Sequence, residues 1–263
     1  MVKQGKYFIV ETDGPVIIWR FNNPLKNLWT VETATEFDDL VEDFYNDPNY
    51  RVGIITSNLQ DVFIQHFDVS LLVSFAEALR AGAPKIPRTT PRGVYRYGPK
   101  PVIAAINAPV AGGGCELSLA CDFRFMSRSA TIGQPEILVG ILPGGGGTQR
   151  MTRIVGINKA LEMMLLGKLI HADEAERIGL VHRACNPDEL MTTTIEFAKE
   201  LATRPPMAVA LIKRCILEGI NMVLEDGLAL EWDLFLDTIK SDDAINLMKA
   251  YVDGGQDSGG LIT

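Results

Sequence analysis

Two glutamates near the middle of this 263-residue chain stand beside glycine clusters and have mostly small or apolar neighbours. Glu116 follows the glycine triplet at residues 112–114, and Glu136 precedes the glycine run at residues 144–147. Burial raises the pKa of a carboxyl group, and two nearby carboxylates repel each other, so one acid of such a pair can be neutral while the other is ionised. This arrangement suits proton transfer from one atom to another. Taken singly, each glutamate has an alternative interpretation as a first-turn helix acid stabilised by the helix dipole.

The spacing of the glycines excludes the common nucleotide-binding motifs. Neither cluster forms GxGxxG, and the chain contains neither GxxxxGK[ST] nor GxSxG. Residues 112–114 instead lie between a predicted strand at 102–106 and a short predicted helix at 115–120. Glycines there let the main chain approach a ligand closely. The free amides at the start of the helix would bind an anion, or an oxygen that becomes negative during a reaction.

The composition excludes several classes of protein. With 25 basic against 33 acidic residues, the net charge of −8 argues against a general binder of nucleic acid or of an anionic membrane. Four scattered cysteines without a CxxC pair, together with three histidines, predict neither a disulfide framework nor a zinc cluster, and we expect reduced, buried thiols. No signal peptide or membrane span is apparent, which favours a soluble, cytoplasmic protein.

The pattern of apolar residues predicts an α/β part followed by a helical part. The expected strands cover residues 7–12, 16–21, 52–56, 102–106 and 130–132, and the expected helices of this part cover 30–45 and 68–79. After residue 187 we expect four helices without a convincing strand, at 190–202, 206–219, 223–239 and 242–252. The boundary between the two parts is expected between residues 185 and 205. A glycine-rich tail from residue 253 is expected to be mobile.

A proline-rich stretch at residues 81–100 concentrates positive charge on an otherwise acidic chain. It has two interpretations, a solvated loop or a flap that attracts an anionic ligand. The sequence leaves both open.

Two long runs carry a resemblance to a known family. Residues 100–122 read KPVIAAINAPVAGGGCELSLACD, and residues 132–150 read IGQPEILVGILPGGGGTQR. Together they resemble the core signature of the crotonase superfamily, and within it most of all the enoyl-CoA hydratases. The resemblance is strong from about residue 100 to residue 185 and is colinear over nearly the whole chain.

The resemblance implies an α/β fold, a crotonase-type spiral of strand–strand–helix turns with a C-terminal helical trimerisation region. Residues 1–195 would form the spiral core with the active site, and residues 196–263 the helical oligomerisation region of a homotrimer or hexamer. It also implies an acyl-CoA substrate, no separate cofactor or metal, and no nucleic-acid or membrane partner. The enolate oxygen of the thioester would be held by the main-chain amides of Phe67 and Gly113.

Members of this superfamily differ chiefly in their acid and base residues, and the presence of both Glu116 and Glu136 favours a hydratase. Glu116, as carboxylate, would activate the water that attacks the β-carbon of a 2-enoyl thioester, and Glu136, as neutral acid, would protonate the α-carbon. The resemblance further suggests that Gly144 positions the acyl chain or the water.

The chain also departs from the family pattern. His66 and Phe67 replace small residues before Asp68, which would narrow the pocket, although a main-chain amide is present with any side chain except proline. His66 is either a structural residue or an added polar contact to the substrate. Lys26 falls where relatives have a nucleotide-contacting lysine, on a loop that is shortened here. The glycine-rich tail lacks the basic and aromatic residues with which many relatives contact coenzyme A.

Other functions are compatible with the same residues. The two acids could instead catalyse another crotonase reaction: double-bond isomerisation, dehydration of a hydroxyacyl-CoA or hydrolysis of a carbon–carbon bond. A non-catalytic crotonase-like scaffold or RNA-binding relative is a further alternative, against which the acidic balance and the retained glutamate pair argue.

Overall fold

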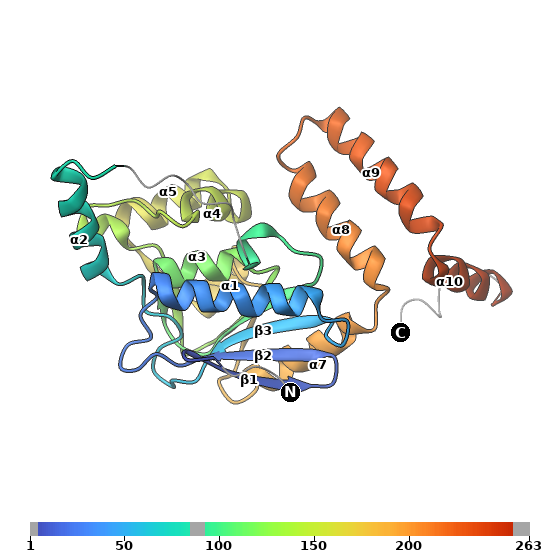
Figure 1. The fold of residues 1–263 in the computed structure, drawn as a ribbon, viewed down its shortest axis with the longest axis horizontal. Helices are drawn as coiled ribbons and strands as arrows, with labels where there is room; N and C mark the ends of the chain where they lie inside the picture. The colour runs from blue at the N-terminus through green and yellow to red at the C-terminus, as the bar shows by residue number, and fades with distance from the viewer. Residues whose placement is uncertain (1–4, 85–92, 255–263) are drawn as a thin grey trace. The chain divides into compact units, whose positions relative to one another are not determined.

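A computed structural model describes residues 5–84 and 93–254, and the chain divides into two compact units, Met1–Ala202 and Thr203–Thr263. Figure 1 labels most of the elements. The first unit contains, in chain order, β1 (Phe8–Asp13), β2 (Val16–Phe21), α1 (Val31–Asn46), β3 (Val52–Ser57), α2 (Val69–Arg80), η1 (Gly93–Arg96), β4 (Val102–Ile106), β5 (Val110–Ala111), α3 (Gly113–Ala120), β6 (Phe123–Ser127), β7 (Thr131–Gly133), η2 (Glu136–Val139), α4 (Gly147–Val155), α5 (Ile157–Leu166), β8 (Leu169–His171), α6 (Ala172–Arg177), β9 (Arg183–Cys185) and α7 (Leu190–Ala202).

The larger sheet has six strands in the order β1-β2-β3-β4-β6-β9. The hairpin expected around Gly14 is present: β1 and β2 pair antiparallel, with Asp13 opposite Val16. Each of the other neighbouring pairs in this sheet is parallel. The α/β class expected from the sequence is therefore confirmed for the first unit.

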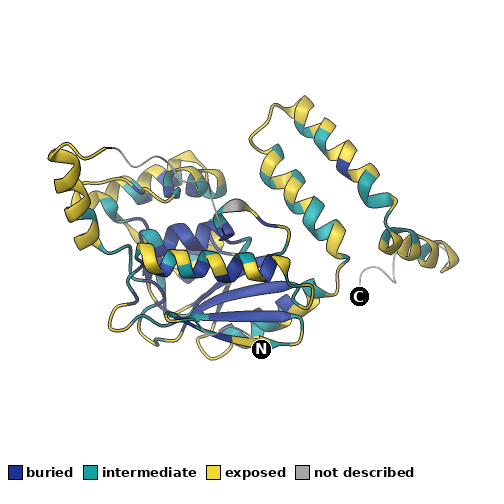
Figure 2. Ribbon diagram, in the orientation of Figure 1, coloured by how far each residue is buried: buried dark blue, intermediate teal, exposed yellow. Residues whose placement is uncertain are grey.

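Both faces of this sheet are covered, as Figures 1 and 2 show for the strands beneath α1. Side chains alternate along β2, so that Trp19 joins the core shared with α1 while Ile18 joins the core shared with α7. The five residues of β4 are all buried and divide between the same two cores. A parallel strand covered on both faces needs apolar residues at every position, which explains the unbroken apolar run at residues 102–106.

A second, three-stranded sheet in the order β5-β7-β8 places the two glutamates. β5 and β7 are parallel neighbours, with Ala111 opposite Gly133, and the amide of Gly112 donates to the carbonyl of Gly133 at 3.1 Å. Parallel strands end at the same edge of their sheet. The segments that follow them, which carry Glu116 and Glu136, therefore start side by side although they are far apart in the sequence.

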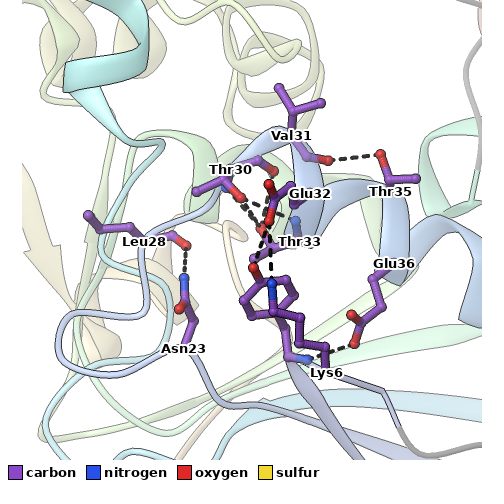
Figure 3. Close-up of polar contacts among 10 residues, drawn as sticks. Lys6, Asn23, Leu28, Thr30, Val31, Glu32, Thr33, Thr35 and Glu36 are labelled. Carbon is purple, nitrogen blue, oxygen red and sulfur yellow. Dashed lines mark hydrogen bonds and ion pairs between the residues drawn. The ribbon is translucent and has the colours of Figure 1, made fainter.

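Helix α1 confirms the helix expected at residues 30–45, and its first turn is fixed by polar side chains (Figure 3). Thr30 and Thr33 form a reciprocal capping box, in which each side-chain oxygen accepts from the other residue's amide at 3.2 and 2.8 Å. The hydroxyl of Tyr7 donates to Glu32 at 2.7 Å, and the amide of Tyr7 donates to Glu36 at 2.8 Å. These contacts attach the start of β1 to the helix.

The second unit contains α8 (Pro206–Gly219), α9 (Leu224–Ile239) and α10 (Asp242–Asp253), which confirms the three helices expected there. No strand is found between residues 203 and 254. The division expected at residue 195 stays a prediction; the contact-based division falls seven residues later and keeps α7 whole within the first unit. Residues 255–263 of the glycine-rich tail lie outside the described part of the chain.

The four cysteines are free, three of them buried and Cys215 only half-buried. Of the basic stretch, residues 85–92 lie outside the described residues, while the ammonium group of Lys100 donates to the carbonyls of Phe44 and Asp47 at the end of α1. Among the described helices none is long and apolar enough to cross a membrane.

Candidate active site

The glycine triplet brings helix α3 against residues 62–67. A Cβ atom on Gly114 would lie 2.5 Å from the carbonyl oxygen of Ile64, and one on Gly113 would lie 3.2 Å from the amide nitrogen of Phe67. Gly112 caps α3 with φ of 51°, a left-handed conformation that favours glycine. The triplet is therefore needed for close approach of main chain to main chain, and it places the Gly113 and Phe67 backbones next to each other.

The amide of Phe67 is aimed by its pairing with Trp29. These two residues form a parallel bridge, in which Trp29 donates to the carbonyl of His66 at 2.9 Å and accepts from the amide of Asp68 at 2.8 Å. In such a bridge the N–H of the central residue points away from its partner, so the Phe67 N–H points away from Trp29. The carbonyl that Trp29 binds belongs to the same peptide group as the Phe67 N–H, so this hydrogen bond polarises the amide and makes it a stronger donor.

Glu116 is buried on the first turn of α3, and the glycine loop holds its carboxylate. The amides of Gly145 and Gly147 both donate to Oε1, at 2.7 and 2.8 Å. A Cβ atom on Gly145 would lie 2.7 Å from Oε2, so a larger residue would collide with the carboxylate. Two amide donors stabilise the ionised form of a carboxyl group. These hydrogen bonds therefore lower the pKa of Glu116, while burial, the larger effect, raises it.

Glu136 opens η2, directly after Pro135, and is half-buried. The side-chain amide of the buried Gln134, with its nitrogen turned toward Glu136, donates to both carboxylate oxygens at 2.7 and 3.1 Å. This orientation follows from the hydrogen-bond partners around the amide. A Cβ atom on Gly112 would lie 3.1 Å from Oε1 of Glu136, so this carboxylate faces the start of α3.

The two glutamates interact electrostatically across the site. Burial and, to a smaller extent, the charge of Glu116 raise the pKa of Glu136 from its ordinary value to about 7. Both carboxylates also contribute to raising the pKa of the buried Cys115 thiol, after the larger effect of burial. At neutral pH such a pair can hold a single proton, which a proton-transfer reaction can use.

Four further residues expected at the site, His66, Asp68, Lys26 and Gly144, differ in their burial and in their hydrogen bonds. His66 is half-buried, its Nδ1 lies 2.7 Å from the carbonyl oxygen of Phe67, and its Cβ faces Gly112. Asp68 caps α2, where its Oδ1 accepts from the amide and the hydroxyl of Ser70, and that hydroxyl lowers the pKa of Asp68. Lys26 and Gly144 are exposed on their loops. Substrate contacts of these four residues stay predictions.

The sequence pointed to the glycine run at residues 144–147 but not to its contact with Glu116, and it did not point to Gln134 or Arg150. Gln134, Gly145, Gly147 and Arg150 all contact the glutamates or the loop that holds Glu116. Two of these residues could have been found from the sequence. Gln134 is a polar residue between a predicted strand and an acid, and Arg150 is the first basic residue after the four glycines. Within residues 5–84 and 93–254 no group of three or more His, Cys, Asp or Glu residues is arranged to hold a metal ion.

The chain is similar in sequence to proteins named as enoyl-CoA hydratases. It is 34% identical over 251 residues to the short-chain-enoyl-CoA hydratase of Clostridium acetobutylicum, covering 93% of this chain and 94% of the relative. Identity and coverage are the same for the crotonyl-CoA hydratase of Syntrophomonas wolfei. These relatives match nearly the whole of both chains.

Solved structures and a family model agree with this similarity. The crystal structure of an enoyl-CoA hydratase from Bacillus anthracis matches with a TM-score of 0.83 at 30% identity, covering 95% of this chain and 97% of that one. The family model described as enoyl-CoA hydratase/isomerase matches residues 11–258. Both the sequence and the fold therefore support one assignment: this chain belongs to the enoyl-CoA hydratase/isomerase family and has the crotonase fold.

Proposed function

We propose that this protein is an enoyl-CoA hydratase, which adds water across the 2,3 double bond of an enoyl-CoA thioester. The observation that carries the proposal is the pair of unlike carboxyl groups: Glu116 held by two amides, and Glu136 with a pKa of about 7. The names of the relatives, a short-chain-enoyl-CoA hydratase and a crotonyl-CoA hydratase, support the same reaction.

In the proposed mechanism Glu116 is the general base. Its Oε1 is occupied by the amides of Gly145 and Gly147, which leaves Oε2 to accept a proton from water. The water oxygen attacks the β-carbon, its proton passes to Glu116, and the electrons of the double bond move to the thioester oxygen. A positioned base of this kind contributes roughly 10²–10⁴ in rate.

Glu136 is the general acid of the second half of the reaction. Because its pKa lies near 7, a large fraction of the enzyme carries the proton that the α-carbon must receive. When the enolate collapses, that proton moves to the α-carbon, and the product is a 3-hydroxyacyl thioester. Glu116 then carries one proton and Glu136 carries none, so exchange with solvent restores the starting state.

The enolate oxygen would be bound by the amides of Phe67 and Gly113. The two backbones lie against each other, the Phe67 peptide is polarised by Trp29, and Gly113 is at the N-terminal end of α3, where the helix dipole favours negative charge. Each such donor contributes about 10²–10³ in kcat. His66, Asp68, Gly144 and Lys26 are proposed to contact the substrate, Lys26 at the nucleotide part of coenzyme A.

We further propose a cytoplasmic homotrimer or hexamer that needs no cofactor besides the coenzyme A of its substrate. Free thiols at the described cysteines fit a reducing compartment. Oligomerisation is supported by large apolar side chains that are exposed on the second unit, among them Ile212, Ile216, Leu228, Trp232 and Phe235.

The test is an assay with crotonyl-CoA in the absence of NAD. Hydration removes the conjugated double bond, so the absorbance of the conjugated thioester should fall and 3-hydroxybutyryl-CoA should accumulate. A 3-enoyl-CoA converted to a conjugated product while crotonyl-CoA persists would identify an isomerase instead. If neither thioester reacts, the proposal is wrong.

A further inference from the structure

Arg150, on the first turn of α4, is held by two tyrosines from the segment before β4. Its Nε donates to the hydroxyl of Tyr97 at 3.1 Å, and its guanidinium carbon lies 5.3 Å from the ring centre of Tyr95 and 5.7 Å from that of Tyr97. Tyr97 has a φ of 58°, which is uncommon for a bulky residue and persists only where surrounding contacts hold it. We call these three residues the arginine clamp.

The clamp is attached to the loop that binds Glu116. One guanidinium nitrogen of Arg150 donates to the carbonyl of Gly145 at 3.0 Å, and the amide of the same glycine donates to Oε1 of Glu116. Gly146, between the two amide donors, has a φ of 105°, which favours glycine, and the guanidinium of Arg150 fills the space that a Cβ atom there would need. The shape of the loop therefore depends on where Arg150 is held.

We infer that Arg150 is a positioning residue for the proposed hydration reaction: clamped by Tyr95 and Tyr97, it fixes the loop whose amides hold the carboxyl group of Glu116. The inference rests on the proposed function, because it assigns Glu116 as the base. It gives a role to residues outside the glutamate pair and the two oxyanion amides.

The charges around Glu116 make this dependence measurable. The ionisable groups that face it are Arg150 from α4, Tyr95 from η1, Glu136 from η2 and the neighbouring Cys115. Burial raises the pKa of Glu116, while the amides of Gly147 and Gly145 and the charge of Arg150 lower it. Loss of Arg150 removes its charge, which lowers the pKa of Glu116. It also loosens the loop whose two amides lower the same pKa.

The experiment compares Arg150→Gln, Arg150→Lys and Arg153→Gln through the pH dependence of kcat/KM with crotonyl-CoA. In Arg150→Gln the acidic limb should move up by about one pH unit, because the base is harder to ionise. Arg150→Lys keeps the charge, so its limb should stay near that of the wild type while kcat falls. Arg153 lies on the same helix and donates to Gln149, so Arg153→Gln should match the wild type.

A second measurement does not depend on turnover. Carbon-13 NMR of protein labelled at the glutamate carboxyl groups, with Glu116→Gln identifying the signal, should show a higher pKa for Glu116 in Arg150→Gln than in the wild type. This signal still decides the inference if the wild type fails to hydrate crotonyl-CoA, which would refute only the proposed function.

If circular dichroism shows that Arg150→Gln is unfolded, Tyr97→Phe is used in its place, because this change removes only a single hydroxyl group. It should shift the Glu116 signal in the same direction by a smaller amount. A folded Arg150→Gln or Tyr97→Phe protein with an unshifted Glu116 signal overturns the inference.

Discussion

Glu116 and Glu136 have the same side chain and differ in what surrounds them. Glu116 is more deeply buried, yet it accepts two main-chain amides and lies in the field of Arg150. Glu136 has a pKa of about 7, which burial raises more than any other influence. At the scale of single residues, the environment therefore separates the proposed base from the proposed acid.

Replacing either glutamate with glutamine should remove its proton transfer and keep its shape. We expect Glu116→Gln and Glu136→Gln each to lower kcat for crotonyl-CoA hydration by at least about 10², with little change in ligand binding. Calorimetric titration with a saturated acyl-CoA checks binding, and circular dichroism checks the fold. Full activity in either variant would refute the role given to that residue.

The raised pKa of Glu136 predicts a pH effect on catalysis and on stability. Activity should fall as pH rises through about 7, because the acid loses its proton. A folded-state pKa above the ordinary 4.5 also means that this group contributes stability at low pH, which is lost as pH rises to about 7. Urea unfolding should show the wild type losing stability relative to Glu136→Gln over this window. A pH-independent difference would contradict the raised pKa.

At the scale of elements, the site depends on close contact between α3 and residues 62–67. Gly114 meets the carbonyl of Ile64, and main-chain atoms cannot move aside as a flexible side chain can. The same contact sets the distance between the Gly113 and Phe67 amides. Packing of the two segments and the proposed stabilisation of the enolate therefore depend on the same contact.

Gly114→Ala should consequently impair both properties. The added methyl group would lie 2.5 Å from the Ile64 oxygen, and we expect a loss of about 1–3 kcal/mol in the free energy of unfolding together with a lower kcat. Gly219→Ala is the matched control, because a Cβ atom there meets nothing within 4 Å. Urea denaturation and the crotonyl-CoA assay measure the two effects. Equal stability of the two variants would show that the close contact carries no strain.

At the scale of the whole molecule, the two units differ in how they use apolar residues. The first unit encloses them in two cores on either side of the larger sheet. In the second unit Leu234 is the buried large apolar residue of α9, while Trp232 is 60% and Leu228 is 53% exposed. Exposed apolar side chains at this density are typical of association surfaces.

A charge on this surface should therefore weaken assembly. We expect Trp232→Glu to lower the mass measured by light scattering after size-exclusion chromatography, because a carboxylate is costly to bury at an apolar interface. Asp233→Asn, at the adjacent position, should leave the mass unchanged. An unaltered mass for Trp232→Glu would place the interface elsewhere.

The sequence by itself predicted the elements whose patterns are local. The apolar run at 102–106 is β4, residues 30–45 correspond to α1 within one residue, and the three C-terminal helices lie where their periodicity indicates. It missed β6 (Phe123–Ser127), where Arg124 interrupts the apolar pattern. The guanidinium of Arg124 is buried and donates to the carbonyls of Leu180, Ser118 and Cys121. Leu180 is 56 residues away, and such a partner cannot be read from a local pattern.

Residue type and spacing along the chain also singled out Glu116 and Glu136 and the glycines beside them. Which main-chain amides hold Glu116, how Gln134 contacts Glu136, and how Arg150 is clamped by two tyrosines were decided only by the tertiary structure. The physical reason is that these interactions act over a few ångströms. For Glu116 and Arg150 they join segments tens of residues apart. Gln134 and Glu136 are only two residues apart, but the turn into η2 decides whether their side chains meet. The register of β5 beside β7 and the approach of α3 to residues 62–67 set those distances.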